Sequence, residues 1–328
     1  MMKKTLASVA AVAMMALAPV TAKALDEITV AYFLEWPMPF QAAKVQGKYD
    51  EALGMKVNWV SFDTGTAMSA AMASGDVHIS VSQGVPPFVV AASGGQDIQV
   101  LDVAVSYADN DNCVVAEALE IDKSNAKELE GKKVGVPLGT AAHYGFLKQM
   151  GHFGVDIGTM DIVNMAPPDG AAAFAQGELD MVCGWGGALR RMVENGNVLL
   201  TGAEKTELGI LVFDVTSAPA SFVAENPDVV SKFLAVTAAA NDKWNSGDKS
   251  DLAVIAKDAG MDEAATAETM ATFTFPGVND QLSEKWLGGN AQTFMKGVAD
   301  VFVDAGSIDK ALDSYEQAVN TGPLSAAK

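Results

Sequence analysis

The strand–helix–strand rhythm of this chain is clearest in residues 56–82, KVNWVSFDTGTAMSAAMASGDVHISVS. Residues 56–62 are rich in β-branched and aromatic side chains, which predicts a strand. Residues 64–74 have helical composition, and Gly75 ends the predicted helix. Residues 77–82 return to a strand pattern. Two strands joined through a helix form a parallel pair with the helix packed on the sheet, so this stretch predicts an α/β fold.

The same rhythm continues on both sides of this stretch. From residue 227 onward the pattern becomes helical for most of the remaining chain. The alternation predicts an α/β protein whose lobes each carry a mixed, mostly parallel sheet flanked by helices. We expect further strands at residues 28–33, 98–105, 113–116, 133–136, 161–165, 179–183 and 210–215.

The length of the chain, 328 residues, favours two lobes over one small core. The second round of strands and helices closes before the chain ends. We therefore predict a discontinuous lobe one, residues 25–112 plus 214–328 with a helical tail, and a lobe two at residues 113–213. The two crossings between them would form a hinge.

Residues 1–24 have the features of a secretory signal peptide. A short basic start precedes an apolar run at residues 6–20, and the small residues Ala22 and Ala24 mark a cleavage site. That run is too short for a spanning helix, which needs about 20 apolar residues. We expect the mature chain to begin near Leu25 as an exported protein.

The charge and the cysteine content limit the kinds of partner and of bound metal that the sequence predicts. The chain has 41 acidic and 22 basic residues, a net charge of −19, which disfavours nucleic acid and anionic membranes as partners. An even number of cysteines in an exported chain favours a disulfide between Cys113 and Cys183, and two buried free thiols are the alternative. Two cysteines and three dispersed histidines lack the spacing of a metal site, so we predict neither metal nor cofactor.

Ligands of open α/β sheets bind at the carboxyl ends of the strands, which points to five loops. In the first, Trp36 forms an apolar wall and Glu35 would face a cation, unless the loop packs on its own lobe. In the second, Gly84 lets a ligand approach the backbone, and the amides of Gly84 and Val85 precede a helix.

The third loop, at residues 136–143, places Thr140 as an N-cap before a helix. The amide of Ala141 and its neighbours would bind an anion, with His143 donating to the same group. A capped helix with a core histidine is the alternative interpretation of this segment.

The fourth and fifth loops supply an aromatic residue and an acid. Trp185 lies between glycines and would cover a ligand, or pack within its lobe. Asp214 is a carboxylate inside an apolar run, costly to bury unless paired with a ligand ammonium or with an internal Lys or Arg. Together the loops predict a small ligand with an anion at one end and an ammonium at the other.

These segments resemble the taurine-binding receptors of ABC importers, within the larger aliphatic-sulfonate and nitrate receptor family. The resemblance implies a periplasmic type II binding fold, sulfonate held by the two helix ends, and the amine held by Asp214 with Trp185 on the ligand. It implies an ABC permease and its ATPase as partners, a monomer and a periplasmic location. The segments that carry it are FDTG at 62–65, ASGDV at 73–77, VPLGTAAHY at 136–144, IVN at 162–164, the prolines at 167–168, the Trp185 loop and FDV at 213–215.

The chain departs from the family pattern where hydroxyl side chains are expected. Gln83 and Gly84 stand in the second loop and Ala141 in the third, so the anion depends more on backbone amides and on Gln83. Hypotaurine, ethanesulfonate or another small zwitterion are the alternative ligands. An enzyme on the same fold is a further alternative, with His143 as its only candidate base.

Overall fold

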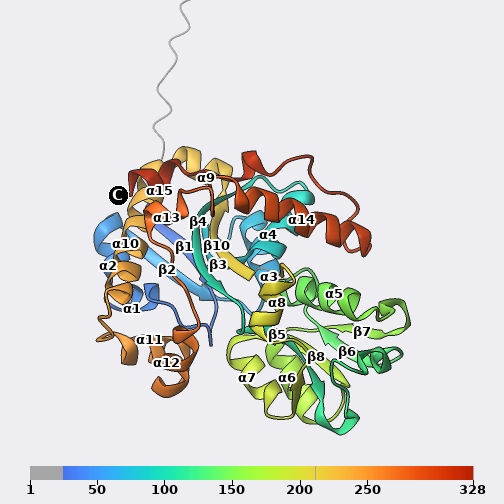
Figure 1. Ribbon diagram of the computed structural model, residues 1–328. Coiled ribbons are helices and arrows are strands. Elements are labelled where there is room, and N and C mark those ends of the chain that lie inside the picture. The colour runs from blue at the N-terminus through green and yellow to red at the C-terminus, as the bar shows by residue number, and fades with distance from the viewer. Residues whose placement is uncertain (1–24, 211, 328) are drawn as a thin grey trace, which may run out of the picture.

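Two five-stranded sheets form the framework of the computed structural model, which describes residues 25–210 and 212–327 (Figure 1). The predicted signal peptide lies outside the described residues. The first sheet has the order β2-β1-β3-β10-β4 and defines lobe one. Its strands are β1 (Glu27–Tyr32), β2 (Lys56–Ser61), β3 (Ile79–Gly84), β4 (Ile98–Tyr107) and β10 (Val212–Pro219).

The second sheet, which defines lobe two, repeats this arrangement in the order β7-β6-β8-β5-β9. In both sheets three parallel strands are followed by an antiparallel strand in the fourth position, β10 in lobe one and β5 in lobe two. The strands of the second sheet are β5 (Asp111–Ala116), β6 (Lys133–Val136), β7 (Asp161–Asn164), β8 (Met181–Trp185) and β9 (Gly196–Val198).

Helices cover the faces of both sheets, as the βαβ rhythm predicts. In lobe two these are α5 (Ala141–Phe153), α6 (Pro167–Ala175) and α7 (Gly186–Val193), with α8 (Gly202–Glu207) on the return to lobe one. The early helices of lobe one are α1 (Phe40–Val45), α2 (Lys48–Leu53), α3 (Gly65–Ser74) and α4 (Val85–Ser93).

The remainder of the chain, after β10, is a tail that consists mainly of helices. Figure 1 shows α14 lying across the top of α4 and beside α5, so the tail touches both lobes. The helices are α9 (Ala220–Glu225), α10 (Pro227–Asn245), α11 (Leu252–Ala259), α12 (Glu263–Ala271), α13 (Val278–Gln281), α14 (Asn290–Asp304) and α15 (Gly322–Ala326). None of the helices within the described residues combines the length and the apolar character that crossing a bilayer requires.

The sheet strands carry the core. Val30, Val81 and Val103 are fully buried in lobe one, and Val134 and Met181 in lobe two. The prediction of an α/β fold with two mixed, mostly parallel sheets is confirmed. Cys113 and Cys183 lie in register on β5 and β8 and form a disulfide in the centre of the second sheet.

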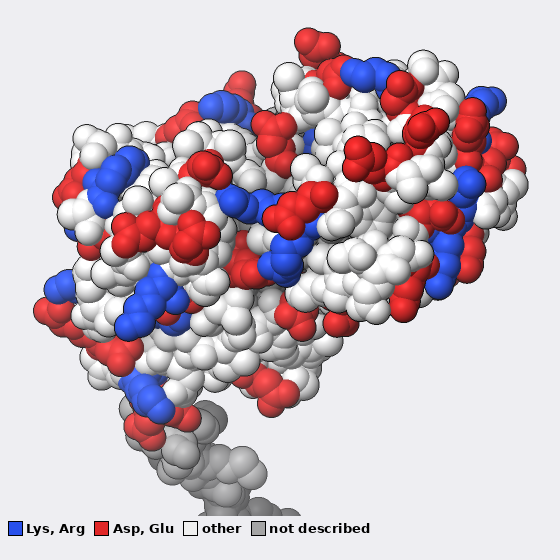
Figure 2. Space-filling view, turned by 90° about the horizontal axis from the view of Figure 1, so that it is seen from below, with Lys and Arg blue, Asp and Glu red and all other residues white. Residues whose placement is uncertain are grey.

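The chain crosses twice between the two sheets. The chain leaves the first sheet after Tyr107 and enters the second at Asp111; it returns to the first sheet at Val212. On the face shown in Figure 2, acidic side chains are scattered over both halves with basic side chains between them.

Candidate functional site: the pocket between the lobes

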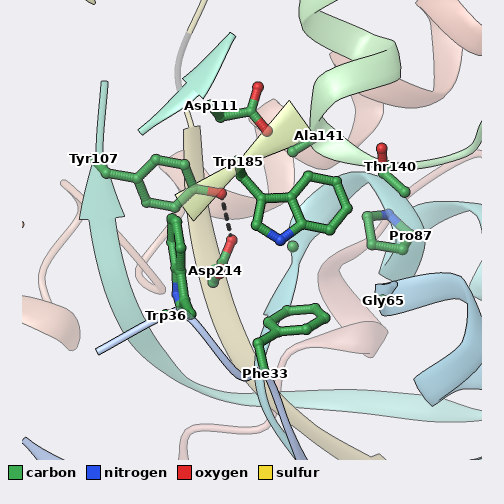
Figure 3. Close-up of a pocket in the computed structure, with 11 residues that line it drawn as sticks. Phe33, Trp36, Gly65, Pro87, Tyr107, Asp111, Thr140, Ala141, Trp185 and Asp214 are labelled. Carbon is green, nitrogen blue, oxygen red and sulfur yellow. Dashed lines mark hydrogen bonds between the residues drawn. The ribbon is translucent and has the colours of Figure 1, made fainter. Parts of the chain in front are cut away.

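A pocket lies where the two sheets face each other (Figure 3). It encloses about 290 Å³ not occupied by protein atoms, part of it open to solvent. It is lined by Phe33, Trp36, Gly65, Gly84, Pro87, Tyr107, Asp111, Thr140, Ala141, Trp185 and Asp214.

Asp214 lies on the crossing strand β10, in register with Gly84 at the end of β3. It is 2 % exposed, and its two oxygens accept hydrogen bonds from the hydroxyls of Ser82 (2.6 Å) and Tyr107 (2.8 Å). No lysine or arginine of the described residues forms an ion pair with it, so the internal salt bridge considered from the sequence is not formed there. Burial raises the pKa of Asp214 to about 7, with the two hydroxyls opposing the shift and the charge of Asp111 adding to it.

A short hydrogen-bonded chain holds this carboxylate in place. Trp36 donates from Nε1 to Oγ of Ser82 over 2.9 Å, and Ser82 donates to Asp214. Ser82 has a φ of 60°, which a residue other than glycine rarely adopts, and this conformation accompanies its hydroxyl contacts. Trp36 also packs edge-on against Tyr107, with ring centroids 4.8 Å apart. These contacts fix the orientation of Asp214 before any ligand arrives.

Asp111 is a second carboxylate at the pocket. It is the first residue of β5, in register with Trp185, and is 2 % exposed. Among the described residues, its Oδ2 has no hydrogen-bond partner, and the ammonium of Lys205 donates to its main-chain carbonyl instead. Burial raises the pKa of Asp111 to about 7, and the nearby charge of Lys205 opposes that shift.

The N-terminus of α5 faces the pocket from lobe two. Thr140 caps the helix, accepting the amide of His143 on its Oγ1. The first amides of a helix have no intrahelical acceptor, so those of Ala141 and Ala142 remain available for an anion. Thr140 and Ala141 both line the pocket.

Aromatic rings close the remaining sides. Trp185 lies at the pocket and packs on Phe33 from the opposite lobe, with ring centroids 6.0 Å apart. Figure 3 shows the Trp185 ring between the strands that carry the two acids and the Phe33 ring. Rings on both lobes therefore meet at one site, which suits a ligand enclosed when the lobes close.

Four of the residues predicted to bind the ligand do not line the pocket, and Glu35 and His143 are two of them. Glu35 is not among the residues that line the pocket; its carboxylate forms a two-pronged ion pair with Arg191 of α7, at 2.7 and 3.0 Å. His143 also lies outside it, stacked on Phe302 of α14 and accepting the Gly139 amide on Nδ1. Its burial lowers its pKa to about 4, so it is a neutral core histidine.

The second predicted helix end also differs from expectation. Gln83 is fully buried, and its side chain is used internally: it donates to Gly65 and Ser69 and accepts from Ser217. Val85 is buried in the core of lobe one and, like Gln83, does not line the pocket. Because prolines follow Val85 in the first turn of α4, and proline has no N–H, this helix end has few amides to offer an anion. Gly84 does line the pocket.

Comparisons with known proteins identify the family of this chain. The family model described as NMT1/THI5 like matches residues 37–244. The chain belongs to this family. It is 31% identical over 206 residues to the taurine-binding periplasmic protein of Escherichia coli (strain K12), a match that covers 63% of this chain and 62% of that protein. The chain thus matches less than two thirds of that relative's length.

Solved structures of this type show the same fold. The alkanesulfonate-binding protein from Xanthomonas axonopodis pv. citri, bound to MOPS, aligns with a TM-score of 0.75 at 17% identity, covering 92% of this chain and 100% of that one. The periplasmic aliphatic sulphonate binding protein of Escherichia coli aligns with a TM-score of 0.71 at 21% identity, covering 91% and 93%. The predicted two-lobed binding-protein fold is confirmed.

Proposed function

We propose that this chain is the extracytoplasmic receptor of an ABC importer and that it captures taurine in the pocket between its lobes. The observation that carries the proposal is Asp214, a buried carboxylate held by neutral hydroxyls and left without a cation among the described residues. A ligand ammonium would supply that cation. The N-terminus of α5 lies in the same pocket and would take the sulfonate.

Family membership and the taurine-binding relative agree with this assignment. In the proposed cycle the receptor is open without ligand and closes on it, because the ligand binds the closed form more tightly. A monomer in the periplasm would then present the closed form to a membrane permease, whose ATPase drives uptake. Residues 1–24 would be removed on export.

We propose no catalytic role for the chain. His143, the one base that the sequence suggested, does not line the pocket and accepts a backbone amide on Nδ1. Binding and release of an unchanged solute need only the groups described above.

Isothermal titration of the mature protein tests the proposal. Taurine, ethanesulfonate and β-alanine separate the two ends of the ligand, because the second lacks the amine and the third lacks the sulfonate. We expect tight binding of taurine and weak binding of both analogues. Tight binding of ethanesulfonate would contradict the amine role of Asp214. Preference for hypotaurine would keep the receptor class and change the ligand.

A further inference from the structure

The two lobes place an aspartate at equivalent positions. Asp214 lies on the antiparallel strand of the first sheet, opposite Gly84, the last residue before α4. Asp111 lies on the antiparallel strand of the second sheet, opposite Trp185, the last residue before α7. Both are buried and line the pocket. In Figure 3 the Tyr107 hydroxyl lies between their carboxyl groups.

The unpaired carboxyl of Asp111 needs an explanation, because burying a carboxylate without a partner is costly. The charged and titratable groups that act on it are Lys205 from α8, Asp214 from β10 and Tyr107 from β4. Lys205 donates to the main chain of Asp111, and Tyr107 donates to Asp214. The Oδ2 of Asp111 is thus a buried acceptor without a donor among the described residues, and it belongs to a side chain that lines the pocket.

We infer that Asp111 is a second ammonium-binding carboxylate, which together with Asp214 makes the pocket selective for a primary ammonium. This inference rests on the proposed function, and it narrows the ligand class. A primary ammonium has three N–H donors. The pocket offers three kinds of acceptor for them: Asp111, the remaining lone pairs of Asp214, and the oxygen of Tyr107.

A quaternary ammonium would not satisfy this site. It has no N–H, so both carboxylates would remain without a donor from the ligand, although the surrounding rings of Trp36, Tyr107 and Trp185 would still attract its charge. The ligand class that fits is a short anion bearing an unsubstituted amine.

Titration calorimetry of wild type, Asp111→Asn and a control variant tests this inference, with taurine, hypotaurine, β-alanine and N,N,N-trimethyltaurine as probes. The control is Asp102→Asn, another buried aspartate, whose oxygen accepts the Thr216 amide outside the pocket. We expect Asp111→Asn to weaken taurine binding about 10- to 100-fold, since a hydrogen bond to a charged group is lost. The control should bind as wild type, and trimethyltaurine should bind far more weakly than taurine.

Thermal melting at pH 8 separates a ligand role from a structural one. Asp111→Asn removes a costly buried charge and also its attraction to the ammonium of Lys205, which keeps Asp109 as a second neighbouring charge. These effects oppose each other, so the melting temperature of the ligand-free variant should equal that of wild type. A lower melting temperature, or unchanged taurine affinity, would overturn the inference and leave the proposed function in place. Equal binding of trimethyltaurine would overturn the primary-ammonium selection. Failure of wild type to bind any of the three primary amines would overturn both proposals.

Discussion

Lobe one and lobe two each bury an aspartate at the pocket, but the two aspartates differ in their hydrogen-bond partners. Each crossing strand carries a buried aspartate opposite the last residue of a parallel strand. In lobe one, Asp214 is held by the hydroxyls of Ser82 and Tyr107. In lobe two, Asp111 has an oxygen without a donor among the described residues.

This difference gives the two aspartates different proposed roles. Asp214 would be a pre-oriented anchor for the ligand amine, and Asp111 would be an acceptor whose hydrogen bond the ligand supplies. The hydroxyls around Asp214 fix its orientation in advance, which reduces the entropy lost on binding. Asp111 lies on the other lobe, so under our proposal it would gain its partner when the lobes close around an ammonium. The same contact that satisfies Asp111 would then favour the closed form.

The largest expected effect on taurine affinity comes from removing the carboxylate of Asp214. Asp214→Ala should reduce taurine affinity by at least 100-fold, since breaking a buried charge pair costs roughly 3–5 kcal/mol. Calorimetry measures the loss, and a thermal melt of the free protein checks folding. Affinity equal to that of wild type would show that the amine does not lie at Asp214.

The pH dependence tests whether both carboxylates ionise on binding. Burial raises the pKa of Asp111 and of Asp214 from 3.8 to about 7. A raised carboxyl pKa means that the folded state holds protons that the unfolded state has lost. The ligand-free protein therefore loses stability as pH rises from 3.8 to about 7, and the loss levels off above that pH.

Taurine affinity should move in the opposite direction over the same window, because the ammonium needs ionised carboxylates. We expect it to strengthen by about tenfold per pH unit for each proton released below the carboxyl pKa. Melting curves and calorimetry at several pH values between about 5 and 8, on both sides of the raised carboxyl pKa, measure both trends. Affinity independent of pH would argue that neither acid changes its charge on binding.

A smaller effect on taurine affinity should follow from removing one of the hydrogen bonds that hold Asp214. Tyr107→Phe removes one hydrogen bond to Asp214 and should weaken taurine binding about tenfold. Because that bond lowers the pKa of Asp214, the midpoint of the affinity–pH curve should move to higher pH in the variant. A midpoint that does not move would separate Tyr107 from the ionisation of the pocket.

The smallest effect should come from the contact between the lobes at the rim. Arg191→Ala breaks the ion pair that joins α7 to Glu35 of lobe one, and should weaken taurine binding by less than about fivefold, because partly exposed pairs contribute little. Lys123→Ala, which breaks a partly exposed pair with Glu204 inside lobe two, is the matched control. A loss from Arg191→Ala as large as that from Asp214→Ala would move the main closing contact from the pocket to the rim.

The sequence predicted the site best where a loop follows a parallel strand. Trp36, Gly84, Thr140, Ala141 and Trp185 all follow or end such strands and all line the pocket. The direction of a side chain was harder to predict, because it depends on tertiary partners. His143 stacks on Phe302, about 160 residues away along the chain, and Gln83 is bonded within lobe one.

Asp111 was missed because strand-end reasoning applies to parallel strands. β5 is antiparallel to its neighbour β8, so its first residue, and not its last, lies at the edge where the ligand binds. The same geometry places Asp214 near the start of β10. An acid at the beginning of a strand that crosses between lobes is the pattern that would have revealed both residues.

The preference for taurine over ethanesulfonate tests the central claim, that Asp111 and Asp214 from opposite lobes both bind the ligand amine. Calorimetry would compare wild type with the double variant Asp111→Asn/Asp214→Asn. We predict that wild type prefers taurine by at least about 100-fold, the factor expected for a buried ion pair, and that the double variant binds ethanesulfonate at least as tightly as taurine. The same preference for taurine in both proteins would contradict the account.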